Sequence, residues 1–233
     1  MLQQTQVTRV TGKYLEFISR FPTVRSLAAS SFVEVLSVWS GLGYNRRAKM
    51  LHMASKEIVS KYAGEFPTNV ETLDELPGIG HATASAICVY AFNFPLSYIE
   101  TNIRTVFIHH FFSGKNVVSD GELLPVIKLA LYHKNPRIWY SALMDYGVFL
   151  KGTIGNLSRK SKHYSKQGVF KGSVRQARGM VLRFLTSKKN HEFLKNELAF
   201  RCAVSKLVFE KACAGLKKDN LIQFRRNMIC LVQ

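Results

Sequence analysis

The sequence contains few cysteines, and their positions exclude two common uses of this residue. The four cysteines, Cys88, Cys202, Cys213 and Cys230, are scattered over 233 residues. Structural zinc sites need closely spaced cysteine pairs, and small disulfide-rich domains need a denser framework. We therefore predict a reducing, intracellular setting with free thiols.

Long apolar runs are also missing. No stretch approaches the roughly 20 apolar residues of a membrane-spanning helix. No cationic segment followed by an apolar run marks a secretory signal near the N-terminus. The hydrophobic fraction is nevertheless 47%, which is enough for one large or two small domains with a real core. We predict a globular protein with no membrane partner.

Acidic residues are scarce, and least frequent in the last third of the chain. The sequence has 33 Lys and Arg against 15 Asp and Glu, a net charge of +18. Residues 149–233 hold 19 of the basic and 4 of the acidic residues. Such a basic segment favours a polyanion as partner. The alternative is a basic surface that serves only solubility.

Apolar periodicity predicts helices over the first 150 residues. Thr68-x-x-Glu71 and Ser119-x-x-Glu122 resemble capping boxes, and Pro136 suits a first helical position. No βαβ rhythm occurs, so the predicted class is all-α. The predicted helices cover about 7–21, 24–29, 31–39, 46–62, 81–92, 102–112, 119–132 and 135–150.

The stretch Leu76-Pro77-Gly78-Ile79-Gly80-His81 lies between two helical patterns. Proline and glycine disfavour a helix interior, so the stretch predicts a tight turn that opens the second helix. Backbone N–H groups at such a helix start suit a phosphate. The pattern is typical of a helix-hairpin-helix DNA-binding unit; an ordinary turn between helices is the alternative.

The remainder of the chain changes character after residue 150. Residues 151–172 lack periodicity and are rich in Gly, Ser and Lys, which predicts a basic linker or loop. Three helices over about 174–186, 190–199 and 203–218 precede an alternating segment around Arg226-Asn227, a hairpin signal. We predict a small winged-helix (α+β) DNA-binding domain over 173–233; a three-helix cap with a frayed tail is the alternative.

Three motifs occur in one order within residues 1–150: Met1-Leu-Gln-Gln-Thr-Gln-Val7, Trp39-Ser-Gly-Leu-Gly-Tyr44 with Arg46 and Arg47, and Leu76 to Ala84. Together they closely resemble the MutY-type adenine DNA glycosylases of the endonuclease III superfamily. The resemblance implies an all-α helix-hairpin-helix glycosylase domain over residues 1–150.

The resemblance also implies a catalytic pair. Glu100 stands where the family carries an aspartate that faces the positive charge developing on the sugar. Asn102 matches the family's active-site asparagine, which would position carboxylate or water. The extra methylene of Glu100 would move the carboxylate by about 1 Å and slow the reaction. The alternative is that Glu100 only caps its helix.

Ala82 bears on the reaction type. Bifunctional relatives carry a lysine nucleophile at this position of the hairpin helix, and some MutY-type members carry a tyrosine. Alanine supplies no amine for Schiff-base chemistry. We therefore predict a monofunctional glycosylase with water as the nucleophile.

The predicted DNA contacts follow from the same resemblance. One wedge would enter the duplex and touch the base opposite the flipped one, and a second wedge loop would help to open the step. Two arginines would face phosphates, and the hairpin would hold the backbone. Tyr44 as a core aromatic and the arginines as a solvated helix end are the alternatives. These residues are Gln3, Gln4 and Thr5; Leu42 and Tyr44; Arg46 and Arg47; and Pro77, Gly78, Ile79, Gly80 and His81.

Two features depart from the family pattern. The general-acid glutamate would lie three residues before Met1, so we expect either a start site upstream or a form that is inactive or poor. Lys151 stands at the first cluster-cysteine position of the family, and no cysteine follows in the linker. An iron–sulfur cluster needs thiolates, so we expect no cluster and no cofactor, apart from a monovalent cation that the family suggests at the hairpin.

The predicted function is base-excision repair on mismatched double-stranded DNA, with removal of adenine opposite guanine or 8-oxoguanine. A thymine glycosylase acting on T·G mismatches is an alternative, and a catalytically impaired DNA-binding relative is another. We expect a monomer in the cytoplasm, associated with the nucleoid.

Overall fold

The computed structural model describes residues 1–3, 5–166, 168–187 and 191–232. Contacts divide the chain into two compact units. Unit 1 comprises Met1–Phe66 and Gly168–Gln233, and unit 2 comprises Pro67–Gln167. Unit 1 is thus built from both ends of the sequence, and each unit is described by itself below.

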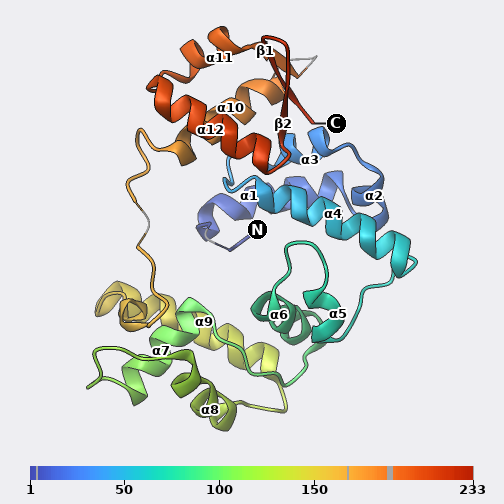
Figure 1. Ribbon diagram of the computed structural model, residues 1–233. Helices are drawn as coiled ribbons and strands as arrows, with labels where there is room; N and C mark the ends of the chain where they lie inside the picture. Colours follow the sequence, from blue (N-terminus) through green and yellow to red (C-terminus); the bar gives the residue numbers. More distant parts are fainter. Residues whose placement is uncertain (4, 167, 188–190, 233) are drawn as a thin grey trace. The chain divides into compact units, whose positions relative to one another are not determined.

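Unit 2 is helical (Figure 1). Its core forms where α7 packs across α9, and apolar residues of α6 and α8 complete it. Pro136 is the first residue of α9, as predicted. The elements are α5 (Val70–Asp74), α6 (His81–Phe92), α7 (Thr101–Phe111), α8 (Asp120–Ala130), α9 (Pro136–Thr153) and the 3-10 helix η1 (Leu157–Lys160).

The two predicted capping boxes have different outcomes. Ser119 and Glu122 form the predicted box at the start of α8, where the Glu122 carboxylate accepts the Ser119 N–H at 2.9 Å. The box predicted at Thr68 is wrong by one residue. Asn69 caps α5, and its side-chain oxygen accepts the Thr72 N–H at 2.8 Å. Asparagine is among the strongest N-cap residues and outcompetes the neighbouring threonine.

The described residues of the first part of unit 1 form the helices α1 (Val7–Arg20), α2 (Val24–Ala29), α3 (Phe32–Trp39) and α4 (Arg46–Lys61). Reciprocal capping boxes start α2, at Thr23 and Ser26, and α3, at Ser31 and Glu34. Trp39 is 2% exposed and packs edge-on against Phe17. The core of this part therefore lies between α1 and α3.

The second part of unit 1 joins helices to a small sheet. It contains α10 (Val174–Ser187), α11 (Lys195–Cys202) and α12 (Lys206–Lys218), together with β1 (Glu192–Leu194), β2 (Ile222–Arg225) and β3 (Met228–Leu231). The sheet is antiparallel, in the order β1-β3-β2. The predicted hairpin is confirmed, and Arg226 at its turn has φ 52°. The helix predicted over about 190–199 is present as α11, but it begins only at Lys195. Glu192–Leu194 instead pairs with β3 through main-chain bonds that periodicity does not reveal.

The two parts of unit 1 share a core. Leu36 of α3 belongs to the same buried cluster as Val181 and Phe209, and α3 contacts α10. The Lys49 ammonium group donates to the carbonyl oxygens of Asp219 and Asn220 at 2.9 and 3.1 Å. The contacts therefore group residues 168–233 with the N-terminal helices. The predicted division of the chain into domains at 1–150, 151–172 and 173–233 remains a prediction.

Candidate nucleic-acid interface and active site

The hairpin turn links α5 to α6 in unit 2. Leu76 is 2% exposed and anchors the turn, and the Ile79 N–H donates to the Leu76 carbonyl at 3.1 Å. Gly78 has φ +76°, a conformation that residues with a Cβ rarely adopt. Gly80 is the N-cap of α6, and its carbonyl accepts the Thr83 and Ala84 N–H groups at 2.8 and 2.9 Å. The predicted turn and helix start are confirmed.

This turn presents backbone to solvent. Pro77 and Ile79 are partly exposed, whereas Gly78, Gly80 and His81 are exposed. The first N–H groups of any α-helix have no partner within the helix, and the helix dipole adds positive potential there. The start of α6 is therefore suited to an anion such as a DNA phosphate.

Glu100 begins α7. It is the N-cap, and its carboxylate oxygen Oε2 accepts the Asn102 N–H at 2.6 Å. The capping role expected as the alternative is therefore real. A carboxylate has two oxygens and about four acceptor positions, so capping leaves acceptor capacity for a substrate.

Asn102 is held from several sides. The Lys151 ammonium group donates to Asn102 Oδ1 at 2.5 Å, and Asn102 Nδ2 lies 3.8 Å from the Met144 sulfur. Gly147 of α9 packs against the Asn102 backbone; a Cβ at Gly147 would lie 2.5 Å from the Asn102 carbonyl oxygen. Glu100, Asn102 and Lys151 thus form one polar cluster in unit 2, which we call the Asn102 cluster. No motif in the sequence marks Lys151 as part of a site, because its partner Asn102 is 49 positions away along the chain.

Three tyrosines support the segment that leads into α7. The Tyr140 hydroxyl donates to the Leu96 carbonyl at 3.0 Å and accepts the Tyr98 N–H at 3.2 Å. The Tyr98 and Tyr140 ring centres are 4.6 Å apart. Burial raises the pKa of Tyr140 to about 12, and burial together with a hydrogen bond to Tyr90 raises that of Tyr98 further. These hydroxyls stay protonated and serve as fixed hydrogen-bonding groups next to Glu100.

Arg47 in unit 1 is partly exposed, but its guanidinium already has partners within the protein. Its guanidinium donates to the carbonyls of Met1 and Gln3, and to the Thr5 hydroxyl at 2.8 Å. It also lies 5.4 Å from the Trp39 ring centre and 5.5 Å from that of Tyr44. Burial lowers the pKa of Arg47. Its position indicates a structural clamp between the N-terminal segment and the loop after α3.

The other residues of unit 1 that were predicted to contact DNA differ in their exposure to solvent. Leu42 is 3% exposed and part of the core, because the glycines on either side of it let the loop fold inward. Its burial argues against insertion of this side chain into DNA. Tyr44 is partly exposed with φ 47°, and its hydroxyl lies 3.4 Å from Arg175 Nη1. Arg46 is exposed and 4.0 Å from Asp219. Gln3 is exposed and Thr5 partly exposed, whereas Gln4 lies outside the described residues.

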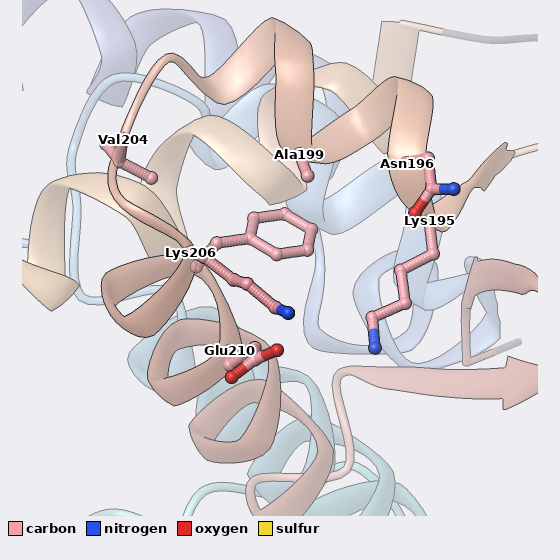
Figure 2. Close-up of a pocket in the computed structure, with 7 residues that line it drawn as sticks. Lys195, Asn196, Ala199, Val204, Lys206 and Glu210 are labelled. Atoms are coloured by element: carbon pink, nitrogen blue, oxygen red, sulfur yellow. The ribbon is translucent and has the colours of Figure 1, made fainter.

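A second basic surface lies on the C-terminal part of unit 1. The exposed positions of α12 include Lys206, Lys211, Lys217 and Lys218, and the β2–β3 turn exposes Arg225 and Arg226. A hollow between α11 and α12 is lined by Lys195, Asn196, Ala199, Val204, Lys206, Phe209 and Glu210. Figure 2 shows the amino groups of Lys195 and Lys206 extending over this hollow, with the Glu210 carboxylate below.

Metal ligands do not gather in the described part of the chain. No group of three or more His, Cys, Asp or Glu side chains within it could hold a metal ion. The four cysteines are buried and free, with Cys88 in unit 2 and the others in unit 1. Their arrangement does not fit an iron–sulfur cluster, which needs converging thiolates. In the same described ranges, no helix has the length and apolar character needed to cross a membrane.

Two curated proteins similar to this chain carry the same name. The chain is 36% identical over 153 residues to "Adenine DNA glycosylase" of Buchnera aphidicola subsp. Baizongia pistaciae, which covers 64% of this chain and 43% of that protein. It is 44% identical over 106 residues to the protein of that name from Mycolicibacterium smegmatis, covering 46% and 36%. The chain therefore matches less than half the length of these relatives.

Solved structures share the fold. "Structure of a thermostable thymine-DNA glycosylase" superimposes with a TM-score of 0.54 at 19% identity, covering 63% of this chain and 69% of that one. "Structure of a Trapped Endonuclease III-DNA Covalent Intermediate: Estranged-Adenine Complex" gives a TM-score of 0.51 at 20% identity, covering 64% and 68%. Residues 1–123, more than half of the chain, match the family described as "HhH-GPD superfamily base excision DNA repair protein". The mostly helical chain, with its small C-terminal antiparallel sheet, belongs to the HhH-GPD superfamily of base excision DNA repair proteins.

Proposed function

We propose that the chain is a monofunctional DNA glycosylase that hydrolyses the N-glycosidic bond of a mismatched base, adenine opposite guanine or 8-oxoguanine. The observation that carries this proposal is the Asn102 cluster at the start of α7, in the same compact unit as the hairpin. The name shared by the curated relatives supports adenine as the base.

The proposed chemistry starts with a base turned out of the helix. As the bond to the base breaks, positive charge develops on the sugar, and the Glu100 carboxylate stabilises it. A water molecule adds to the sugar carbon, its proton is released, and the departing base takes up a proton. The alanine at position 82 supports water rather than an amine as nucleophile, because it has no group that can attack.

We propose that DNA binds to the hairpin and to part of the N-terminal surface. Exposed N–H groups at the start of α6 suit a phosphate, with a monovalent cation bound at the same turn. Gln3, Thr5, Tyr44 and Arg46 remain candidates for contacts near the mismatch, because they are at least partly exposed. Leu42 is left out because it is 3% exposed. Arg47 is left out because its guanidinium donates to Met1, Gln3 and Thr5.

We also propose that residues 173–233 form a winged helix that binds duplex DNA. The element order α10-β1-α11-α12-β2-β3 and the strand order β1-β3-β2 support this interpretation. In such domains the second helix of the helix-turn-helix enters the major groove. Here that helix is α12, with exposed lysines, and the β2–β3 turn carries Arg225 and Arg226. No iron–sulfur cluster is part of the proposal, and the protein acts as a monomer in the cytoplasm.

A single-turnover nicking assay tests the function. Labelled duplexes with A·8-oxoguanine, A·G and T·G pairs are incubated with this chain and with a form extended upstream of Met1, then treated with hot alkali. We expect alkali-dependent cleavage of the adenine duplexes. Glu100→Gln should lose about 10²- to 10³-fold in rate, by analogy with loss of one charge-stabilising group. Glu71→Gln, a change at an exposed residue of α5, is the matched control. Binding without cleavage on all three duplexes would contradict the proposal, and cleavage of T·G alone would change the base.

A further inference from the structure

We propose that Lys151 is a positioning residue that fixes the orientation of the Asn102 amide beside Glu100. The inference rests on the proposed glycosylase function, because it gives the Asn102 cluster a reaction to serve. It assigns a role to a residue from a part of the sequence that looks like a linker.

The chemistry of the two side chains fixes the amide. A lysine ammonium group has donors and no acceptor, so its partner on Asn102 must be the oxygen. The amide nitrogen then points the other way, where Nδ2 lies 3.8 Å from the Met144 sulfur. A thioether is a weak acceptor, and the nitrogen has two N–H groups. Lys151 therefore determines that the Asn102 oxygen faces the ammonium group and that the Asn102 N–H donors point away from it, toward the side where Met144 lies.

Lys151 is placed to remain charged in this position. It lies in the last turn of α9, where the helix dipole favours a cation. Burial lowers its pKa, and the nearby Glu100 carboxylate opposes that shift. A charge-assisted hydrogen bond is shorter and stronger than a neutral one, so the ammonium group is well suited to hold the Asn102 side chain in one orientation.

The backbone of Asn102 does not depend on Lys151. Gly147 packs against the Asn102 main chain, and the Glu100 carboxylate accepts its N–H. Removing Lys151 should leave the fold intact and release only the Asn102 side chain. A solely structural lysine would instead affect stability and leave the rate unchanged.

The test compares three forms of the full chain: wild type, Lys151→Met and Lys151→Cys treated with bromoethylamine, which restores an amine of near-lysine length. The four natural cysteines are buried, and treated wild type controls for their reaction. Lys160→Met is the matched control, since Lys160 donates to the Ser113 carbonyl at 2.9 Å in the same unit.

We expect Lys151→Met to lower the single-turnover rate about 10- to 100-fold, because small misplacements of reacting groups have effects of this size. Affinity for the duplex should change by less than about 3-fold, since the residue acts after binding. Aminoethylated Lys151→Cys should regain most of the rate, and Lys160→Met should match wild type. A Lys151→Met rate equal to wild type, or no recovery on aminoethylation, would overturn the inference.

A second readout does not need turnover. Each form is bound to duplexes that carry a cationic pyrrolidine or a neutral tetrahydrofuran at the abasic position. Wild type should prefer the cationic analogue. Lys151→Met also removes a positive charge next to Glu100, which by itself favours a cation, so Lys151→Arg is added as the form that keeps the charge but changes the donor geometry. Lys151→Arg should lose part of the preference for the cationic analogue. If wild type shows neither cleavage nor preference, the proposed function fails and the inference fails with it. If wild type shows both, and the Lys151→Met rate or the Lys151→Arg preference is unchanged, the inference alone fails.

Discussion

Each unit contains a half-buried cation that joins segments distant in sequence, but the two cations hold different groups. Arg47 in unit 1 binds the carbonyls of Met1 and Gln3, so its charge is used on main chain. Lys151 in unit 2 binds a side-chain amide next to Glu100. Arg47 belongs to a sequence motif that predicted DNA contact, whereas Lys151 lies in a stretch of sequence that was predicted to be a linker.

The comparison shows that a basic residue's role follows from what surrounds it. A cation whose N–H groups donate to backbone carbonyls has few free donors for phosphates. A cation that orients a side chain in the active site can instead change the reaction rate. The two units should therefore respond differently to substitution and pH.

Gly147→Ala should have the largest effect, and it is confined to unit 2. The new Cβ would lie 2.5 Å from the Asn102 carbonyl oxygen and 2.7 Å from the Asn102 Cβ, so α7 and α9 must move apart. Such overpacking costs about 1–3 kcal/mol or more, measured as the free energy of unfolding in urea. Gly152→Ala on the same helix is the control, since a Cβ there meets nothing within 4 Å. Equal stability of the two variants would refute the close packing.

Arg47→Met tests the clamp in unit 1. We expect a loss of about 1–3 kcal/mol of stability, because the partner carbonyls and the Thr5 hydroxyl lose their donor. The salt dependence of DNA binding should hardly change. Arg46→Met, at an exposed neighbour, should leave stability unchanged and lower the salt slope by about one unit if it contacts a phosphate. The reverse pattern would restore Arg47 as a phosphate contact.

His52 should make unit 1 sensitive to mild acid. Its Nε2 donates to the Ser30 carbonyl at 3.0 Å, and its ring stacks on Phe32. Burial and the nearby Lys56 charge lower its pKa from the ordinary value of 6.5, and the Ser30 contact opposes them. The unfolded ring gains a proton first as pH falls, so this stability is present above pH 6.5 and lost below it. Faster hydrogen exchange in α4 at pH 5.5 than at pH 7, after correction for intrinsic rates, would agree; an unchanged ratio would not.

Glu122 should make unit 2 respond only to stronger acid, and this effect should be the smallest. Its hydrogen bonds with Lys115 and Ser119 lower its pKa from 4.5 to about 2. The contribution is therefore present above pH 4.5 and lost as pH falls through about 2. The Tm difference between wild type and Glu122→Gln should shrink between pH 5 and pH 2.5. A difference independent of pH would show that the carboxylate charge plays no part.

Local patterns in the sequence were sufficient for most elements. The helix at His81–Phe92 and the Ser119 cap are as predicted, because turn residues and caps act within four positions of the chain. Errors occurred where a distant partner decides. Glu192–Leu194 is a strand because β3 pairs with it, and Leu42 is buried because the loop after α3 folds onto the core of α1 and α3.

The sequence by itself determined the helical class, the hairpin turn, the family and the candidates Glu100 and Asn102. These depend on residue type and short spacing, which are fixed along the chain. The tertiary structure decided the hydrogen-bond partners of each cation. Arg47 donates to backbone carbonyls, and Lys151 donates to Asn102, which is 49 positions away along the chain. Burial and hydrogen bonding between distant residues exist only once the chain is packed, since they depend on which surfaces meet.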